Sequence, residues 1–81
     1  MLIPLYGFVR GDTLGLLVLA HAGDTVQALA ASMQQAACMR VAPARRVAVY
    51  HEGVLLAPDL TLEQVGLSAL ARVDLVPEPE G

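Results

Sequence analysis

The chain has 81 residues and a mass of 8.5 kDa; 56% of its residues are apolar and only 16% are charged. A chain of this length encloses one hydrophobic core, which excludes a multidomain enzyme, and its apolar content excludes a disordered chain. Basic residues are few and all arginine, and the net charge of −3 argues against nucleic-acid binding, which needs clustered cations. The low charge of so small a domain is the first property that needs an explanation.

A single cysteine, Cys38, excludes an internal disulfide, and a reducing cytoplasm is the expected compartment. The longest uncharged stretch, residues 25–39, is interrupted by glutamine and serine, so we expect no membrane-spanning helix. Leu14–Ala22 imitates the apolar part of a signal peptide, but Asp12 cancels the charge of Arg10 in front of it. We therefore expect this segment to belong to the folded domain.

A β-hairpin is predicted at the start of the chain. Leu2–Val9 and Leu14–Ala20 are apolar and β-prone, and Arg10–Thr13 between them contains the glycine typical of a tight turn. The two strands should therefore pair in antiparallel fashion.

The main helix is predicted over Thr25–Cys38, or one residue longer. Asp24 is a suitable N-cap, and Gln27 follows three residues later, as in a capping box. Pro43 prevents the helix from continuing. Apolar side chains recur at helical spacing and form one stripe, which consists of Val26, Leu29, Ala30, Met33 and Ala37.

The second half of the chain predicts three short strands, Arg46–Tyr50, Val54–Leu56 and Arg72–Val76. The first two flank a turn at His51–Gly53. Before the last strand, Thr61 and Gln64 form a second capping box, and Gly66 should end a very short helix there.

This order of elements predicts an α+β domain, in which a mixed sheet of four to five strands packs on one main helix. It resembles the ubiquitin-like β-grasp, with Asp24-Thr25 opening the helix and Leu62–Leu67 preceding the last strand. Residues 1–76 should form the ubiquitin-like domain. Residues 77–81 should form an acidic, Pro-rich and mobile tail.

No catalytic, cofactor-binding or metal-binding residue is expected in this chain. His21 and His51 have no ligand at metal-binding spacing beside them, and Asp59 and Glu63 are better explained as acids near a helix start. The potential nucleophiles lack an adjacent base or motif; these are Ser32, Cys38 and Ser68.

The sheet is predicted to be apolar on both faces. Where Leu16 and Val18 face the helix, Leu17 and Leu19 must face the other way, because strand side chains alternate. A single helix covers one sheet face, so the second should be polar. Scattered surface leucines, or a register shifted by one residue, are the alternative explanation. We predict instead that this face binds another protein through Tyr6, Phe8, Leu17, Leu19, Arg45, Arg46 and Tyr50.

Between about Ile3 and Val76 the chain resembles the toluene-4-monooxygenase system protein B family. The resemblance rests on Met39–Pro43 with a valine-rich strand after it, and on Leu56–Thr61 before Gly66-Leu67. A proline near the start and a phenylalanine before the first turn also fit. These proteins are the small gamma subunits of soluble bacterial di-iron multicomponent monooxygenase hydroxylases. This chain departs from them in its main helix and third strand, where Ala, Gln and Val replace charged residues.

The resemblance implies a non-catalytic subunit that packs on the large hydroxylase subunit within a hetero-oligomer. The complex would oxidise aromatic or alkene hydrocarbons with dioxygen in the cytoplasm. The di-iron centre would lie in the partner large subunit, so no cofactor is expected in this chain. Nucleic acid and membrane are not expected partners.

Three other functions stay open at this point. One is a free-standing ubiquitin-like protein-interaction module, including one associated with secretion. A conjugated modifier is another, although the chain ends in Glu80-Gly81 without a Gly-Gly pair and contains no lysine. The third is a small enzyme of a type that the sequence does not reveal.

Overall fold

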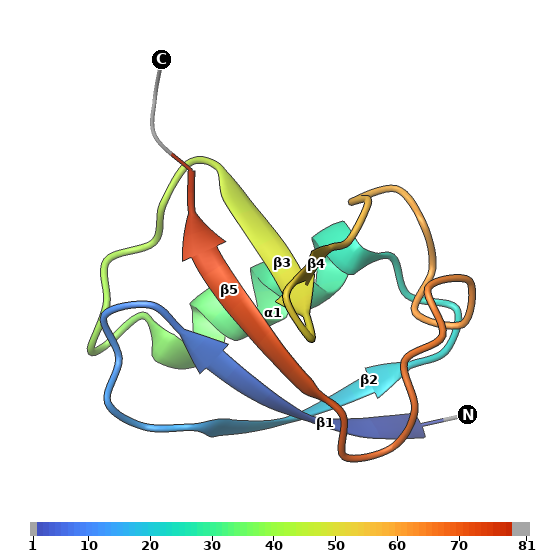
Figure 1. Ribbon diagram of the computed structural model, residues 1–81. Helices are drawn as coiled ribbons and strands as arrows, with labels where there is room; N and C mark the ends of the chain where they lie inside the picture. Colours follow the sequence, from blue (N-terminus) through green and yellow to red (C-terminus); the bar gives the residue numbers. More distant parts are fainter. Residues whose placement is uncertain (1, 79–81) are drawn as a thin grey trace.

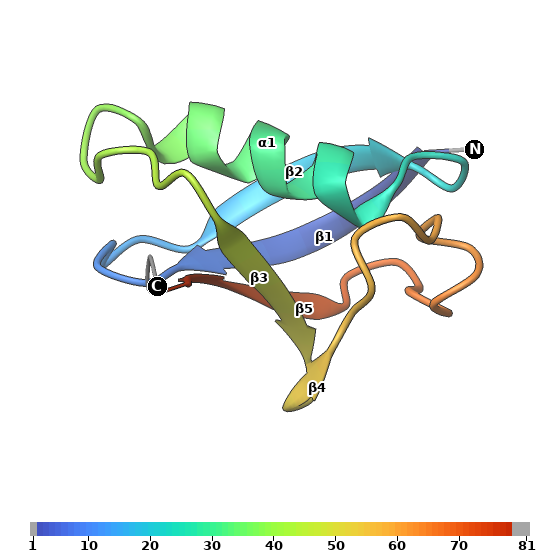
Figure 2. The same ribbon diagram turned by 90° about the horizontal axis from the view of Figure 1, so that it is seen from above.

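The computed structural model describes residues 2–78, which form a five-stranded mixed sheet with one helix packed on one face (Figure 1 and Figure 2). The strand order is β2-β1-β5-β3-β4, so β2 and β4 form the two edges. β1 and β5 are parallel, and the other neighbours are antiparallel. The predicted α+β architecture is confirmed. The elements are β1 (Leu2–Val9), β2 (Leu16–His21), α1 (Val26–Ala37), β3 (Val47–His51), β4 (Val54–Leu55) and β5 (Arg72–Pro77).

The register of the β1–β2 hairpin confirms the predicted faces. Leu5 lies opposite Val18 and both are buried, whereas Tyr6 lies opposite Leu17 and both are exposed. The shifted register considered above is therefore wrong. The second strand begins at Leu16, two residues later than expected, because the connection from Val9 is a longer loop than a tight turn.

The N-cap of α1 is Thr25, and the prediction of Asp24 was wrong. The side chain of Thr25 accepts a hydrogen bond from the amide of Ala28 at 3.1 Å. Asp24 accepts one from the amide of His21 at 2.9 Å, so it stabilises the turn that enters the helix. Thr25 therefore caps the helix, and Asp24 stabilises the turn in front of it, although both residue types are good helix caps. The helix ends at Ala37.

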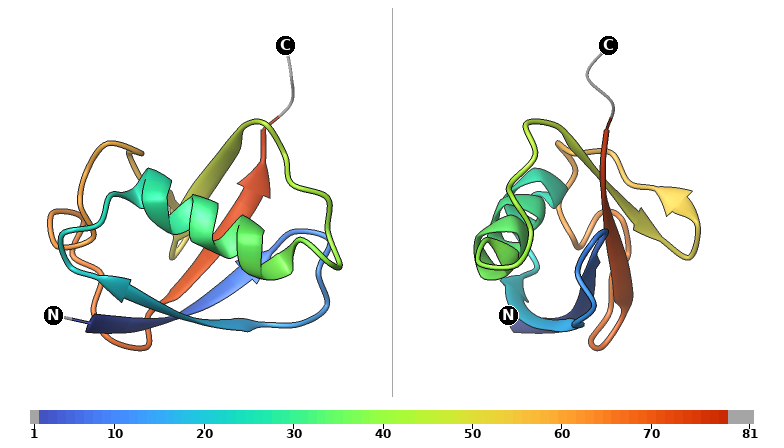
Figure 3. Two further views of the ribbon diagram at one scale, coloured as in Figure 1. Left: turned by 180° about the vertical axis from the view of Figure 1, so that it is seen from behind. Right: turned by 90° about the vertical axis from the view of Figure 1, so that its left-hand side faces the viewer.

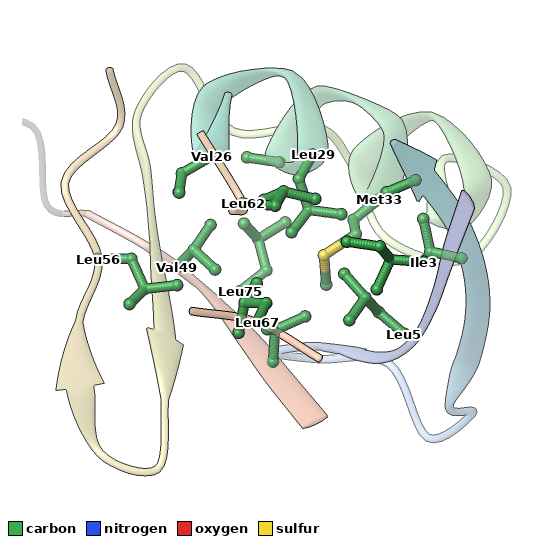
Figure 4. Close-up of a cluster of buried hydrophobic side chains, with 14 of the residues drawn as sticks. Ile3, Leu5, Val26, Leu29, Met33, Val49, Leu56, Leu62, Leu67 and Leu75 are labelled. Carbon is green, nitrogen blue, oxygen red and sulfur yellow. The ribbon is translucent and has the colours of Figure 1, made fainter. Parts of the chain in front are cut away.

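The hydrophobic core lies between α1 and the inner face of the sheet (Figure 4). The predicted helical stripe is buried throughout. The loop before β5 adds Leu62, which is fully buried although it belongs to no regular element. The most deeply buried large side chains come from the helix, from this loop and from strands β1 and β5; they are Leu5, Val26, Leu29, Met33, Leu62, Val73 and Leu75.

Residues 61–67 form a capped turn, and the predicted short helix is absent from the described part of the chain. The capping box itself is confirmed: the amide of Thr61 donates to Gln64 at 2.9 Å, and the amide of Gln64 donates to the Thr61 hydroxyl at 3.1 Å. Gly66 has a φ of 79°, and the amide of Leu67 donates to the carbonyl of Leu62. This arrangement is a Schellman closure, which ends the turn before a helix can extend.

The β3–β4 connection is a two-residue turn in which Glu52 and Gly53 both have positive φ, 52° and 79°. Such turns match the twist of the strands that they join. β4 is one residue shorter than predicted. At the other end of the sheet, β5 continues through Pro77, and the amide of Glu78 donates to the carbonyl of Arg46. The remainder of the predicted tail, residues 79–81, lies outside the described residues.

An ion pair joins the β1–β2 loop to the segment after α1. The Arg40 guanidinium lies 2.9 Å from Oδ2 of Asp12, and Oδ1 of the same carboxylate accepts a hydrogen bond from the amide of Leu14 at 3.1 Å. The hydrogen bond from Arg40, helped by that from Leu14, lowers the pKa of Asp12 from its ordinary value of 3.8. Two segments that are distant in the sequence are thereby held together above one end of the core.

Replacing Asp12 by asparagine is expected to lower the resistance of the domain to urea at neutral pH. A lowered carboxyl pKa gives stability that is present above the unfolded pKa and is lost as the pH falls through the folded pKa. The native chain and Asp12→Asn should therefore differ near neutral pH and converge in acid below the ordinary pKa of 3.8. Urea unfolding over this pH range measures the difference. The same change at the exposed Asp59 is the control, and a gap that persists in strong acid would contradict the prediction.

Candidate protein-binding face of the sheet

The helix covers one face of the sheet and leaves the other uncovered (Figure 3). On the uncovered face of the β1–β2 hairpin, Tyr6 is paired with Leu17, and Pro4 is paired with Leu19. Leu17 and Leu19 are 63% and 64% exposed, and Tyr6 is 46% exposed. Side chains on opposed residues of paired strands are in reach of one another. We name this surface the hairpin patch; it consists of Leu2, Pro4, Tyr6, Leu17 and Leu19.

Phe8 lies beside the hairpin patch but is half-buried. The Arg72 guanidinium stacks over its ring, 4.2 Å from the centroid. Gly15 lies against the ring as well, since a Cβ at that position would stand 2.9 Å from a ring atom. Phe8 is therefore held in place by its neighbours and lies at the border of the hairpin patch.

Tyr50 lies on the same face of the sheet, two strands away from β1. It pairs with Asp74 on β5 and with Leu55 on β4. Between Tyr50 and the hairpin, β5 presents Arg72 and Asp74, whose side chains form an ion pair at 3.1 Å. The uncovered face thus has a polar centre with apolar groups on both sides. In such an arrangement the apolar groups can give affinity for a bound protein, and the charged pair can fix its orientation.

Arg45 and Arg46 do not join the hairpin patch. They precede β3, which β5 separates from the hairpin, and they line a groove between α1 and β3. Of the residues predicted for the interface, the structure therefore brings Tyr6, Leu17 and Leu19 together, and adds Phe8 at their border.

Leu70 is a further apolar side chain beside this face, and the sequence pattern does not predict it. Its φ of 66° is rare for a bulky residue, and strain of this kind costs about 1–3 kcal/mol. Its amide donates to the carbonyl of Pro4 at 2.6 Å, so it lies beside the hairpin patch, and 56% of it is exposed. No neighbouring residue type predicts this positive φ, because the conformation accompanies the hydrogen bond to Pro4 on β1, which is distant in the sequence.

No group of three or more His, Cys, Asp or Glu residues that could hold a metal ion exists within residues 2–78. His21 ends β2, and His51 ends β3 with its Nδ1 2.9 Å from the carbonyl oxygen of Arg72. Asp59 and Glu63 are exposed in the loop before β5. Over the same described range, no helix has the length and apolar character that crossing a bilayer requires.

No family model matches the sequence, and no curated protein matches it. Several solved structures are similar to this chain. A chain of the toluene 4-monooxygenase HD complex with the inhibitor 4-bromobenzoate has a TM-score of 0.86 and 22% identity, over 96% of this chain and 100% of that one. Caldiarchaeum subterraneum ubiquitin has a TM-score of 0.77 and 18% identity, over 100% of this chain and 99% of that one. The chain has the ubiquitin-like β-grasp fold.

A plant protein supports the same assignment. The ubiquitin-like domain of an Arabidopsis thaliana protein has a TM-score of 0.76 and 16% identity, over 98% of this chain and 80% of that one. At such identities the likeness establishes the fold alone. The β-grasp expected from the order of elements is therefore confirmed, and the function has to be argued from the surface of this ubiquitin-like chain.

Proposed function

We propose that this ubiquitin-like chain is the non-catalytic small subunit of a bacterial di-iron monooxygenase hydroxylase. The observation that carries the proposal is the likeness to a chain of the toluene 4-monooxygenase HD complex, which extends over the whole of that chain at a TM-score of 0.86. The sequence resemblance to the toluene-4-monooxygenase system protein B family covers nearly the same residues, about Ile3 to Val76, and adds support of its own.

The hairpin patch supports a permanent partner. An independent domain normally places polar residues on a sheet face that no helix covers. Here Tyr6 and two leucines are about half exposed or more. Stable interfaces bury a total of about 1,200–2,000 Å² and are centred on aromatic and apolar anchors. We propose that the large hydroxylase subunit covers this face, with the Arg72–Asp74 pair fixing its orientation.

The chemistry in this proposal belongs to the partner. The di-iron centre, the substrate pocket and the reaction of dioxygen with an aromatic or alkene hydrocarbon lie in the large subunit. This chain supplies no iron ligand and is not itself an enzyme; its task is to pack on the large subunit. A cytoplasmic location belongs to the same proposal.

Purification of the tagged chain from its native host tests the proposal. The expected result is a stoichiometric complex with a protein of several hundred residues whose sequence contains two E-x-x-H helices, the ligand pattern of a di-iron site. Mass spectrometry identifies the partner, and iron analysis of the complex measures the metal. Elution of the tagged chain alone, as a stable monomer, would contradict it.

A free-standing ubiquitin-like interaction module is the second candidate. It is favoured by the likeness to Caldiarchaeum subterraneum ubiquitin, in which each chain is covered almost completely. Such a module should remain soluble and monomeric without a partner. Sedimentation of the isolated chain at increasing concentration distinguishes the two candidates, because an unpartnered hairpin patch should cause self-association.

A further inference from the structure

A groove of about 630 Å³ runs between α1 and the open edge of β3, away from the hairpin patch. Its helical wall contains alanines and glutamines, including Ala31 and Gln34. Val49 and Leu56 contribute apolar side chains from the side of the sheet. Gln34 also accepts the amide of Ala44, which fixes the segment that leads into β3.

The backbone at the start of β3 is open toward this groove. The amide of Glu78 donates to the carbonyl of Arg46 on the β5 side, and the amide of Leu56 donates to the carbonyl of Val49 on the other side. Polar groups of successive residues in an antiparallel ladder point to alternate sides. The N–H and C=O of Val47 therefore point away from β5. β4 covers β3 only at its far end, so no strand of residues 2–78 lies beside Val47 there.

The mouth of the groove is cationic. Arg45 and Arg46 are adjacent and exposed, whereas the two ion pairs within the described residues engage Arg40 and Arg72. Within residues 2–78, one carboxylate, that of Glu78, also lines the groove. The described residues at this end of β3 thus carry two cations against one carboxylate, a local charge opposite to the net charge of −3 of the whole chain.

We propose that this groove binds an extended, acidic segment of another polypeptide, which adds a short strand to the open edge of β3. Backbone hydrogen bonds to Val47 would give affinity. Alternate apolar side chains would enter the groove, and flanking carboxylates would lie beside Arg45 and Arg46, as in other cases of strand addition. This inference goes beyond the proposed subunit role, because it concerns a second surface and holds for the isolated chain.

A blocked peptide, Ac-Glu-Glu-Val-Ile-Val-Glu-Glu-NH2, is the probe. Titrated into the full-length, ¹⁵N-labelled chain, it should shift the amide signals of Val47, Ala31 and Leu56 and leave those of Leu17 and Leu19 in place. A peptide with lysine at every glutamate position should bind about tenfold more weakly, because its lysines would be repelled by Arg45 and Arg46, which attract the glutamates of the acidic peptide. Methylation of two adjacent central amides of the acidic peptide should abolish binding, since it blocks the strand hydrogen bonds.

The double variant Arg45→Glu, Arg46→Glu reverses the charge of the mouth. It should bind the acidic peptide about tenfold more weakly and the lysine peptide more tightly than the native chain does. Arg10→Glu, in the exposed turn after β1, is the matched control and should bind as the native chain does. Any one of four results would overturn the inference. These are equal binding of the two peptides, signal shifts confined to the hairpin patch, undiminished binding after methylation, and no binding at millimolar peptide. None of these results tests the proposed subunit function, which purification of the tagged chain from its host tests separately.

Discussion

Replacing Leu29 or Val49 by aspartate is expected to unfold the domain. Both side chains are 2% exposed and point into the core, one from α1 and the other from β3 (Figure 4). Truncating a buried leucine alone costs about 2–5 kcal/mol. An unpaired carboxylate at the same place adds a desolvation cost of several kcal/mol. A chain of this length has about 4–12 kcal/mol of stability in total, at about 0.05–0.15 kcal/mol per residue.

Circular dichroism and the dispersion of the amide proton spectrum measure the effect. Neither variant should show a cooperative thermal transition. Ser32→Asp, which places the same charge on the exposed side of α1, should melt close to the native chain. Leu29→Met keeps the volume and should cost less than about 1.5 kcal/mol. A native-like melt of Leu29→Asp or Val49→Asp would show that the core is assigned wrongly.

If the proposed function is right, replacing Leu17 or Leu19 by arginine is expected to prevent assembly with the large subunit while the domain stays folded. Both leucines are more than 60% exposed in the isolated chain, at 63% and 64%, so the folded state loses little. In the complex, a buried arginine without a partner would cost about 2–5 kcal/mol, which weakens association about 30-fold to several thousand-fold. Co-purification with the large subunit measures assembly, and circular dichroism verifies the fold.

The matched control is Ser32→Arg, which adds the same charge on the helical side of the domain. It should co-purify as the native chain does. If Leu17→Arg and Leu19→Arg also co-purify normally, the hairpin patch is not the interface, and the partner must cover another surface. If they fail to fold, the assignment of these side chains to the uncovered face is wrong.

The faces of the hairpin could be predicted from the sequence because alternation is a local property of a strand. Once Leu5 and Val18 are placed in the core, Tyr6 and Leu17 have no other side to occupy. The main helix was predictable for a similar reason, since its apolar stripe repeats at helical spacing. The identity of its cap was not, because Asp24 and Thr25 are both good caps and only the tertiary hydrogen bonds separate their tasks.

Features that depend on the order of the strands could not be predicted in this way. The frequency of arginine at interfaces predicts that Arg45 and Arg46 join the hairpin, yet β5 lies between β3 and β1. The conformation of Leu70 follows from its contact with Pro4, more than 60 residues earlier in the chain. The segment around Gly66 has the composition of a helix start, but its closure comes too early for a helix to form.

The position of β2 at the sheet edge has a consequence for the supply of this protein in the cell. Leu16–His21 contains neither a charged residue nor a proline, the features with which natural edge strands usually prevent pairing with other chains. The same strand displays Leu17 and Leu19 to solvent. Chains whose hairpin patch is left uncovered would therefore be expected to join edge to edge and aggregate. If the large subunit covers the patch, as proposed, the two proteins have to be produced in matching amounts.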